Sequence, residues 1–263
     1  MTRDQLRHYL AFYRDLGFDE LRLPAPAVQP AAGQTADEEA TPPPAARPTT
    51  PTGPPPASPP AAMLSLLPAI APEGDTLARI REDIGECRRC RLCEGRSRIV
   101  FGSGNESSAL VFVGEGPGAD EDAQGLPFVG RAGQLLTQMI DNTCAKDGIP
   151  IRRKDVYICN VVKCRPPGNR TPMPDEMEIC GQFLFRQLLA IRPKAICCLG
   201  STAAKALLGV KEGVMRLRGN WHKWRDIPVM VTYHPSYLLR PYNQNAKLEA
   251  WQDLRKVFHY VYD

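Results

Sequence analysis

Three polar side chains lie at the ends of three separate apolar runs of this sequence. Glu115 and His234 come close behind such runs, and Asn160 lies inside one near its end. The carboxyl ends of parallel strands meet at one edge of a sheet, where open α/β folds bind ligands. Three chemical groups would therefore meet there. They are a carboxylate, an amide that can both donate and accept hydrogen bonds, and an imidazole that can donate to a developing anion. The pattern predicts a catalytic site at this edge, although Asn160 taken alone could also be a loop cap.

A glycine-rich turn follows the first apolar run. Residues 109–136 read ALVFVGEGPGADEDAQGLPFVGRAGQLL, and the glycines of GEGPG indicate a backbone that bends sharply and lies close to another group. The turn lacks the third glycine of a dinucleotide-binding fingerprint, and no Gly-Lys-Ser/Thr of a Walker A loop follows it. Two interpretations stay open, the wall of a ligand site and a tight strand–helix connection with a solvated acidic loop.

Cysteines suggest a second centre. Cys87 and Cys90 form a CxxC pair in a basic loop, and Cys164 and Cys180 flank a proline-rich segment. Four thiolates from two loops are suitable ligands for an iron–sulfur cluster or a zinc ion. Cys93 extends the first pair to CxxCxxC, but we favour it as a bystander. The other cysteines are expected to have structural roles in the core, three in strands and one on a helix: Cys159, Cys197, Cys198 and Cys144.

Composition narrows the class of protein. No run of 18 apolar residues exists and the charged N-terminus does not resemble a signal peptide, so nine cysteines indicate free thiols or metal ligands rather than disulfides. Residues 77–263 hold 28 Lys and Arg against 20 Asp and Glu, whereas residues 1–76 are acidic. A basic globular part suits a polyanionic partner.

The chain divides into three expected parts. Residues 1–23 have apolar residues at helical spacing, residues 24–76 hold 15 of the 26 prolines and resemble a disordered linker, and a folded domain covers 77–263. Strands and helices alternate in that domain, which predicts an α/β fold with a parallel sheet covered on both faces. The expected strands are 109–113, 156–162, 195–199 and 228–233. The expected helices are a short one from Thr76 towards Cys87, and 131–147, 174–190, 201–208 and 246–261.

Four motifs together resemble a known family. They are GEGPG with LPFVGRAGQLL, NVVKCRPPGNRTP, HPSYLLR and CRRCRLCEGR, and they span about residues 77–262. In this order they are similar to the family 4 uracil-DNA glycosylases, the iron–sulfur branch of their superfamily. The resemblance implies a three-layer α/β/α sandwich with a central four-stranded parallel sheet. It also implies a 4Fe-4S cluster on Cys87, Cys90, Cys164 and Cys180, and hydrolysis of the N-glycosidic bond of uracil in DNA.

The resemblance also implies roles for single residues. Phe128 is expected to stack on a flipped uracil, Asn160 to hydrogen-bond its Watson–Crick edge, and His234 to stabilise the departing anion. Glu121 is expected to crowd the C5 side, where thymine carries a methyl group. The first motif, Gly114, Glu115 and Gly116, is expected to line the pocket.

One position bears on the mechanism. Several related families place a water-activating Asp or Asn where this sequence has Gly116, so Glu115 is the first candidate for the carboxylate near the sugar. An enzyme that flips a base must hold the DNA by contacts to its phosphates, and Lys and Arg side chains would supply these contacts. The candidates for DNA contacts are Arg131, Lys163, Arg165, Arg170 and Arg240.

Three alternative functions stay open at this point. One branch of the superfamily captures uracil-DNA covalently through a His in a basic insert, but the segment RPPGNRTPMPDE has neither. A redox protein built on CxxCxxC would not need GEGPG or HPSYLLR. Residues 1–23 could make the protein mainly a recruitment module with a protein partner. Otherwise we expect a DNA-associated, cytoplasmic monomer of bacterial or archaeal type.

Overall fold

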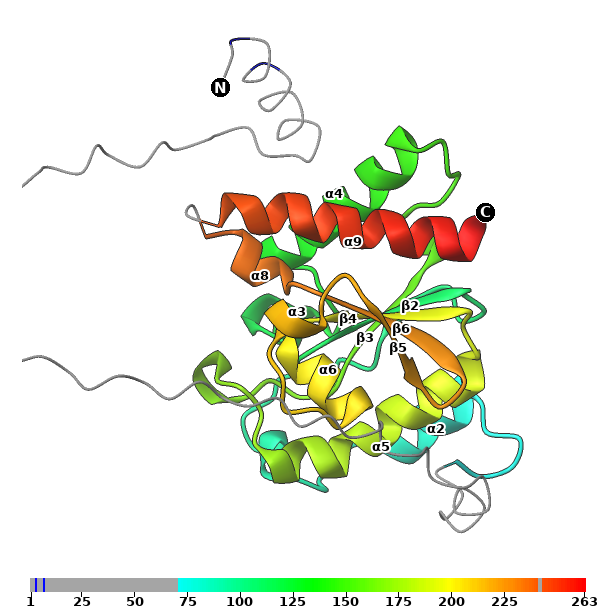
Figure 1. Cartoon of the computed structure of the whole chain (residues 1–263). Coiled ribbons are helices and arrows are strands. Elements are labelled where there is room, and N and C mark those ends of the chain that lie inside the picture. The colour runs from blue at the N-terminus through cyan, green and yellow to red at the C-terminus, as the bar shows by residue number, and fades with distance from the viewer. Residues whose placement is uncertain (1–2, 4–6, 8–70, 241–242) are drawn as a thin grey trace, which may run out of the picture. The chain divides into compact units, whose positions relative to one another are not determined.

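The computed structural model describes residues 71–240 and 243–263, together with residues 3 and 7 (Figure 1). The helix expected over 1–23 and the linker expected over 24–76 lie almost wholly outside these residues, so both stay predictions. No helix among the described residues is long and apolar enough to cross a membrane.

A mixed six-stranded sheet forms the centre of the domain, in the order β1-β3-β2-β4-β6-β5. The four inner strands are parallel, and the two edge strands pair antiparallel with their neighbours. The α/β prediction is confirmed, with two edge strands added to the expected four. The strands are β1 Ser103–Gly104, β2 Leu110–Gly114, β3 Tyr157–Asn160, β4 Ala195–Leu199, β5 Trp221–Trp224 and β6 Ile227–Thr232.

Helices cover both faces of the sheet, as Figure 1 shows with α4 and α9 on one side and α2, α5 and α6 on the other. The α-helices are α2 Leu77–Ile84, α3 Ala119–Gln124, α4 Arg131–Lys146, α5 Pro174–Ile191, α6 Ser201–Leu208, α7 Val214–Leu217, α8 Pro235–Leu238 and α9 Gln244–Tyr262. Three short 3-10 turns complete the described elements: η2 Arg91–Cys93, η3 Arg153–Asp155 and η4 Pro167–Asn169.

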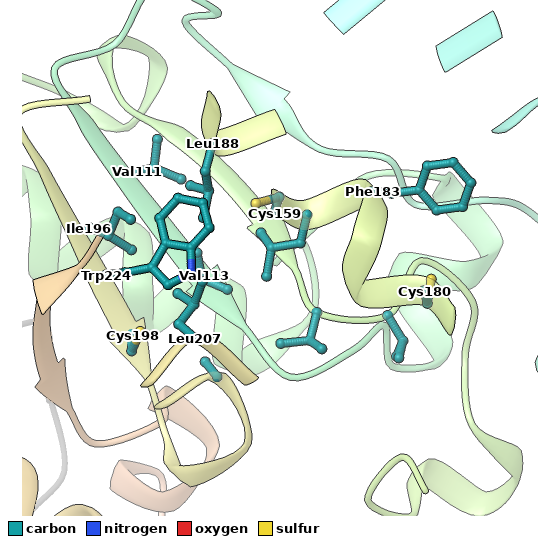
Figure 2. Packing of buried hydrophobic residues seen from close by; sticks show 14 of the residues in the cluster. Val111, Val113, Cys159, Cys180, Phe183, Leu188, Ile196, Cys198, Leu207 and Trp224 are labelled. Carbon is teal, nitrogen blue, oxygen red and sulfur yellow. The ribbon is translucent and has the colours of Figure 1, made fainter. Parts of the chain in front are cut away.

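Alternate residues of each inner strand enter two separate cores. Val111 and Val113 of β2 pack with α5 on one face, and Leu110 and Phe112 pack with α4 and α9 on the other. Figure 2 shows the first core, where the β2 valines lie among side chains of β4, β5 and α5. Both faces are buried, which explains why the inner strands are continuous apolar runs. The four cysteines expected to be structural are fully buried in these cores: Cys144, Cys159, Cys197 and Cys198.

Candidate active site

A cavity of about 460 Å³ opens at the edge of the sheet where the parallel strands end. Its size and its mixture of glycine, aromatic and polar walls suit a small organic ligand. The chain elements that reach it are the turn after β2, the end of β3, the first turn of α6 and the start of α8. Its walls include most of the predicted site residues: Glu115, Gly116, Glu121, Phe128, Arg131, Asn160, Arg170 and His234.

The glycines of the turn make room for neighbouring side chains. A Cβ added to Gly114 would lie 2.4 Å from Oδ1 of Asn160 and 2.5 Å from Cζ of Phe128. One added to Gly116 would lie 2.8 Å from a methyl group of Val162. Both contacts are closer than a methyl group tolerates, so the glycines allow the wall to close around these side chains. This geometry favours the ligand-site interpretation of the turn.

Phe128 is held against His234 in an unusual backbone conformation. Its φ is +53°, which is uncommon for a bulky residue, and its ring is almost fully buried. The two rings lie 5.6 Å apart at an interplanar angle of 37°. Gly133 is needed behind it, since an added Cβ would lie 1.9 Å from the carbonyl carbon of Phe128. Arg153 braces the same loop by donating to the oxygen of Pro127 at 2.7 Å, a contact that sequence patterns did not indicate.

The carboxylate of Glu121 is hydrogen-bonded to the main chain of the glycine-rich turn and of the loop that follows it. Its carboxylate accepts hydrogen bonds from the main-chain N–H of Gly118 at 3.1 Å and of Val129 and Gly130 at 2.9 Å. These bonds join the two ends of the loop that carries Phe128. The carboxylate is therefore engaged by the backbone while its residue lines the cavity.

Asn160 places an unpaired acceptor in the site. It ends β3 directly beside Gly114 of β2 and is 1% exposed. Its Oδ1 is buried and finds no hydrogen-bond partner among the described residues. Buried amide oxygens are almost always paired, so one that is not, in the wall of a cavity, indicates a missing donor from a ligand.

His234 caps the N-terminus of α8. Its Nδ1 accepts from the main-chain N–H of Ser236 at 3.2 Å and lies 2.7 Å from the hydroxyl oxygen of Ser236. An accepting Nδ1 leaves the proton of a neutral ring on Nε2. Burial lowers the pKa of His234 to about 4, against a smaller opposing effect of the Glu121 carboxylate. The imidazole is therefore a neutral N–H donor at neutral pH.

Glu115 is paired with a residue that the sequence analysis did not select. The hydroxyl of Thr202 donates to Oε2 of Glu115, and Thr202 is buried in the first turn of α6. The N-terminus of a helix and a hydroxyl donor both favour a negative charge. The partners are far apart in the sequence, so no local pattern could have linked them.

A second cavity is lined by five cysteines: Cys87, Cys90, Cys93, Cys164 and Cys180. Two donors face its sulfurs. The N–H of Lys163 lies 3.2 Å from Sγ of Cys180, and the Arg96 guanidinium lies 3.5 Å from Sγ of Cys164. Burial raises the pKa of Cys164 to about 11 and that of Cys180 to about 12, so their thiolates need a neighbouring cation.

The sulfurs do not gather around a single point. Among the described residues, no group of three or more His, Cys, Asp or Glu side chains is arranged to hold one metal ion. A zinc ion would require its ligands within about 2.3 Å, whereas a polynuclear cluster is larger and takes four more widely spaced thiolates. The donor set itself, cysteine side chains from separate segments of the chain, is the type that iron–sulfur clusters take.

The predicted DNA contacts differ in their surroundings. Arg131 is exposed at the start of α4, and exposed Arg240 lies 5.8 Å above the ring of Tyr237. Arg165 donates to Oδ1 of Asn169 at 2.8 Å. Arg170 forms two bonds to the buried carboxylate of Glu176, at 2.7 and 2.8 Å, and so has a structural role in the cavity wall.

Lys163 does not lie on the surface, which contradicts its expected contact with phosphates. It is fully buried, and its ammonium group donates to the main-chain oxygen of Asn160 and to Gln187. A lysine beside a motif in a basic segment resembles a surface cation in sequence. Its burial depends on α5, which packs over it from a distant part of the chain.

The sequence of this chain is similar to those of several known proteins. Residues 101–255 match the family described as the Uracil DNA glycosylase superfamily. The type-4 uracil-DNA glycosylase of Thermotoga maritima is 44% identical over 184 residues, which cover 69% of this chain and 93% of that protein. The type-4 enzyme of Archaeoglobus fulgidus is 42% identical over 191 residues, 70% of this chain and 92% of that protein. A type-5 uracil-DNA glycosylase of Pyrobaculum aerophilum is 37% identical over 114 residues, 42% of this chain and 47% of that protein.

Proposed function

This chain belongs to the uracil DNA glycosylase superfamily and to its type-4 branch, and we propose that a flipped uracil binds in the cavity at the sheet edge. The side chains around that cavity then catalyse hydrolysis of the N-glycosidic bond. The protein is a uracil-DNA glycosylase of base excision repair, and the geometry of the cavity supports the roles proposed below for its residues. A base inside a duplex must leave the stack before its glycosidic bond is accessible, at a cost of a few kcal/mol. The cavity lies at the sheet edge and is open to the surface, as such a substrate requires.

The unpaired Oδ1 of Asn160 is the observation that carries this proposal. The Watson–Crick edge of uracil has an N3–H donor between two carbonyl acceptors. The Asn160 amide can accept from N3–H through Oδ1 and donate to O4 through its NH₂ group. Cytosine has an unprotonated N3 and an amino group at C4, so its donors and acceptors are reversed at both positions. An amide held in this orientation therefore selects uracil against its parent base, whereas a flipped amide would match cytosine.

Phe128 supplies the surface on which the base stacks. The main chain of Phe128 has an unusual φ and lies close against Gly133, so its position is set before the base enters. Glu121 holds the Phe128 loop in place through three N–H bonds. We assign to Glu121 this ordering role together with the crowding of the C5 side that would exclude thymine.

His234 stabilises the leaving group. As the glycosidic bond breaks, negative charge develops on uracil, and the neutral imidazole donates from Nε2 to its O2. A donor that is already oriented, here by Ser236 on Nδ1, needs no reorganisation during the reaction. Proton transfer is not required, because a hydrogen bond from a neutral imidazole is enough to stabilise the anion.

Glu115 acts on the sugar side of the bond. Positive charge develops on the deoxyribose as uracil departs, and a carboxylate held by Thr202 lies in the same cavity wall. It can stabilise this charge and orient the water molecule that adds to the sugar. No other carboxylate is placed in the first motif between Gly114 and Pro117.

Cys87, Cys90, Cys164 and Cys180 are proposed to hold a 4Fe-4S cluster. When bound, such a cluster would join the loop before β1, which carries Cys87 and Cys90, to Cys164 in the segment between β3 and α5 and to Cys180 on α5 itself. That segment contributes Pro166, Asn169 and Arg170 to the wall of the base cavity. The cysteines thereby fix the shape of a wall that has little regular structure of its own.

The remaining cations are proposed to contact DNA phosphates: Arg131, Arg165, Arg170 and Arg240. The bidentate bond to Glu176 orients the Arg170 guanidinium beside the cavity mouth rather than leaving it mobile. Phosphate contacts fix the position of the duplex, whereas Asn160 reads the base.

Release of uracil from a labelled oligonucleotide tests the proposed function. The full chain should convert a strand with one uracil to an abasic strand, and leave matched strands with cytosine or thymine intact. Asn160→Ala should lose most of this activity. An unchanged rate of uracil release by Asn160→Ala would remove the amide from base recognition. Persistence of a protein–DNA adduct on a denaturing gel would instead indicate covalent capture without turnover.

A further inference from the structure

Lys163 is a buried cation between the two cavities. Its side chain is inaccessible to solvent, and Nζ donates to the main-chain oxygen of Asn160 at 2.8 Å and to Oε1 of Gln187 at 2.6 Å. Among the described residues, Nζ is bonded to these two neutral oxygens and forms no salt bridge with a carboxylate. Burying an ammonium group without a carboxylate partner reduces the free energy of unfolding. A lysine at this position is therefore a candidate for a functional role.

The main chain of Lys163 belongs to the cysteine cavity. Its N–H donates to Sγ of Cys180 at 3.2 Å, its oxygen accepts from the N–H of Val100 at 2.8 Å, and the next residue is Cys164. The side chain runs in the other direction, back to the end of β3. One residue therefore connects the cysteine cavity to the strand end that carries the base-reading amide.

Gln187 of α5 fixes the far end of the lysine. Its amide NH₂ donates to the main-chain oxygen of Phe101 at 3.0 Å and lies 3.3 Å from the hydroxyl oxygen of Tyr157. Gln187 is fully buried too. The ammonium group is thus held in a buried polar network that spans α5, β3 and the segment before β1, and such networks specify one arrangement.

The position of the Asn160 side chain depends on this network. Its amide packs against Gly114 with no room for a methyl group, and its Oδ1 has no bond within the described protein to orient it. The bond from Lys163 to the main-chain oxygen restrains the backbone from which the amide projects. A displacement of a fraction of an ångström would weaken a hydrogen bond to the base edge.

We propose that Lys163 is a positioning residue that aligns the Asn160 amide with uracil by joining it to the cysteine cavity. This proposal rests on the proposed role of Asn160 in reading the base. Lys163 thereby couples the integrity of the cysteine site to the geometry of base recognition.

A double-mutant cycle between Lys163→Met and Asn160→Ala in the full-length protein tests the coupling. Lys163→Met keeps the length and the apolar stem but removes both Nζ bonds, and exposed Lys154→Met on η3 is the matched control. We expect Lys163→Met to lower kcat/KM for uracil-DNA about ten-fold, the scale found for residues in contact. It should retain the iron content and visible absorption of the purified wild type, and its effect should largely disappear in the Asn160→Ala background.

Additive effects of the two substitutions, or an unchanged kcat/KM of Lys163→Met, would overturn the coupling. So would a loss of iron that accounts for the loss of activity, because Lys163 would then only support the cysteine site. If Asn160→Ala itself has no effect, the proposed function of Asn160 fails instead. Should Lys163→Met be insoluble, Gln187→Met removes one of the two Nζ acceptors, and its effect must likewise disappear with Asn160→Ala.

Discussion

The ring of Phe128 lies 5.6 Å from the ring of His234, although the two residues come from opposite halves of the domain. Phe128 lies in the loop between α3 and α4, and His234 lies at the end of β6. Each ring thereby limits the position of the other, and the cavity between the strand ends acquires one stacking face and one donor. The proposed chemistry needs both groups on the same base, one above its plane and one at its O2 atom.

Gly114→Ala is predicted to abolish uracil release while the protein still folds. The added methyl group would lie 2.4 Å from Oδ1 of Asn160 and 2.5 Å from the Phe128 ring, so both groups of the base pocket must move. Overpacking of this kind costs about 1–3 kcal/mol, which a domain of this size can tolerate. Single-turnover excision and thermal unfolding measured together would separate the two effects.

Gly213→Ala is the matched control for this substitution, because a Cβ there meets nothing within 4 Å and its φ is negative. It should leave excision unchanged. Wild-type excision by Gly114→Ala would show that the pocket does not depend on the close approach at this turn.

His234→Ala is predicted to slow uracil release by about 10²–10³-fold, the usual loss for one oriented donor to a developing anion. Binding of uracil-DNA should change little, because the donor acts mainly on the charge of the transition state. Single-turnover rates and equilibrium binding of the same duplex would measure the two quantities. A large loss of affinity with an unchanged rate would contradict the assignment.

The lowered pKa of His234 also predicts a pH dependence of stability. The ring titrates near 4 in the folded protein and near its ordinary value of 6.5 when unfolded. Between these values the unfolded chain binds the additional proton, so stability from this group is present above pH 6.5 and is lost as the pH falls towards 4. The melting temperatures of wild type and His234→Asn should be measured across this pH range. The melting temperature of the wild type should fall more steeply as the pH decreases. The same dependence of melting temperature on pH in both proteins would contradict burial of a neutral imidazole.

The positions of the inner strands within residues 77–263 could be predicted from the sequence because these strands are buried on both faces. Such strands are uninterrupted apolar runs, and each precedes a helix with a clear start. The edge strands carry no such signal: β1 has only two residues, and β5 reads WHKW with polar residues among aromatic ones. Sequence reasoning therefore located the sheet and omitted its edges.

The functional side chains divide in the same way. Glu115, Asn160 and His234 were selected because each follows a strand, and the fold brings strand ends together. Thr202 was missed because its relevance depends on a contact across the sheet edge. Lys163 was misinterpreted because its burial depends on α5, and no property of the sequence around Lys163 indicates that this helix packs over it.

Cys164→Ser and Cys93→Ser are predicted to differ sharply, although both side chains face the same cavity. Loss of Cys164 should remove the visible iron–sulfur absorption and lower the yield of folded protein, since a thiolate ligand and its bond from Arg96 are both lost. Cys93→Ser should retain iron and activity. Iron analysis and the absorption spectrum of the two variants would decide the ligand set. Equal loss of iron in both would make Cys93 a ligand, and stoichiometric zinc in the wild type would exclude the cluster.

Thr202→Val is predicted to lower kcat about ten-fold with little change in KM, because it removes a hydrogen bond to a charged group without changing side-chain volume. The bond holds the Glu115 carboxylate where positive charge develops on the sugar, and that charge exists only in the transition state. Thr202→Ser keeps the hydroxyl and should restore most of the rate, which a role in packing alone would not explain. Thr202→Val should also have no further effect in a Glu115→Gln background, since the hydroxyl acts through that carboxylate. Steady-state kinetics of the two Thr202 variants, of Glu115→Gln and of the Thr202→Val and Glu115→Gln double variant on one uracil-containing duplex would test the assignment. An equal loss in Thr202→Val and Thr202→Ser would refute it.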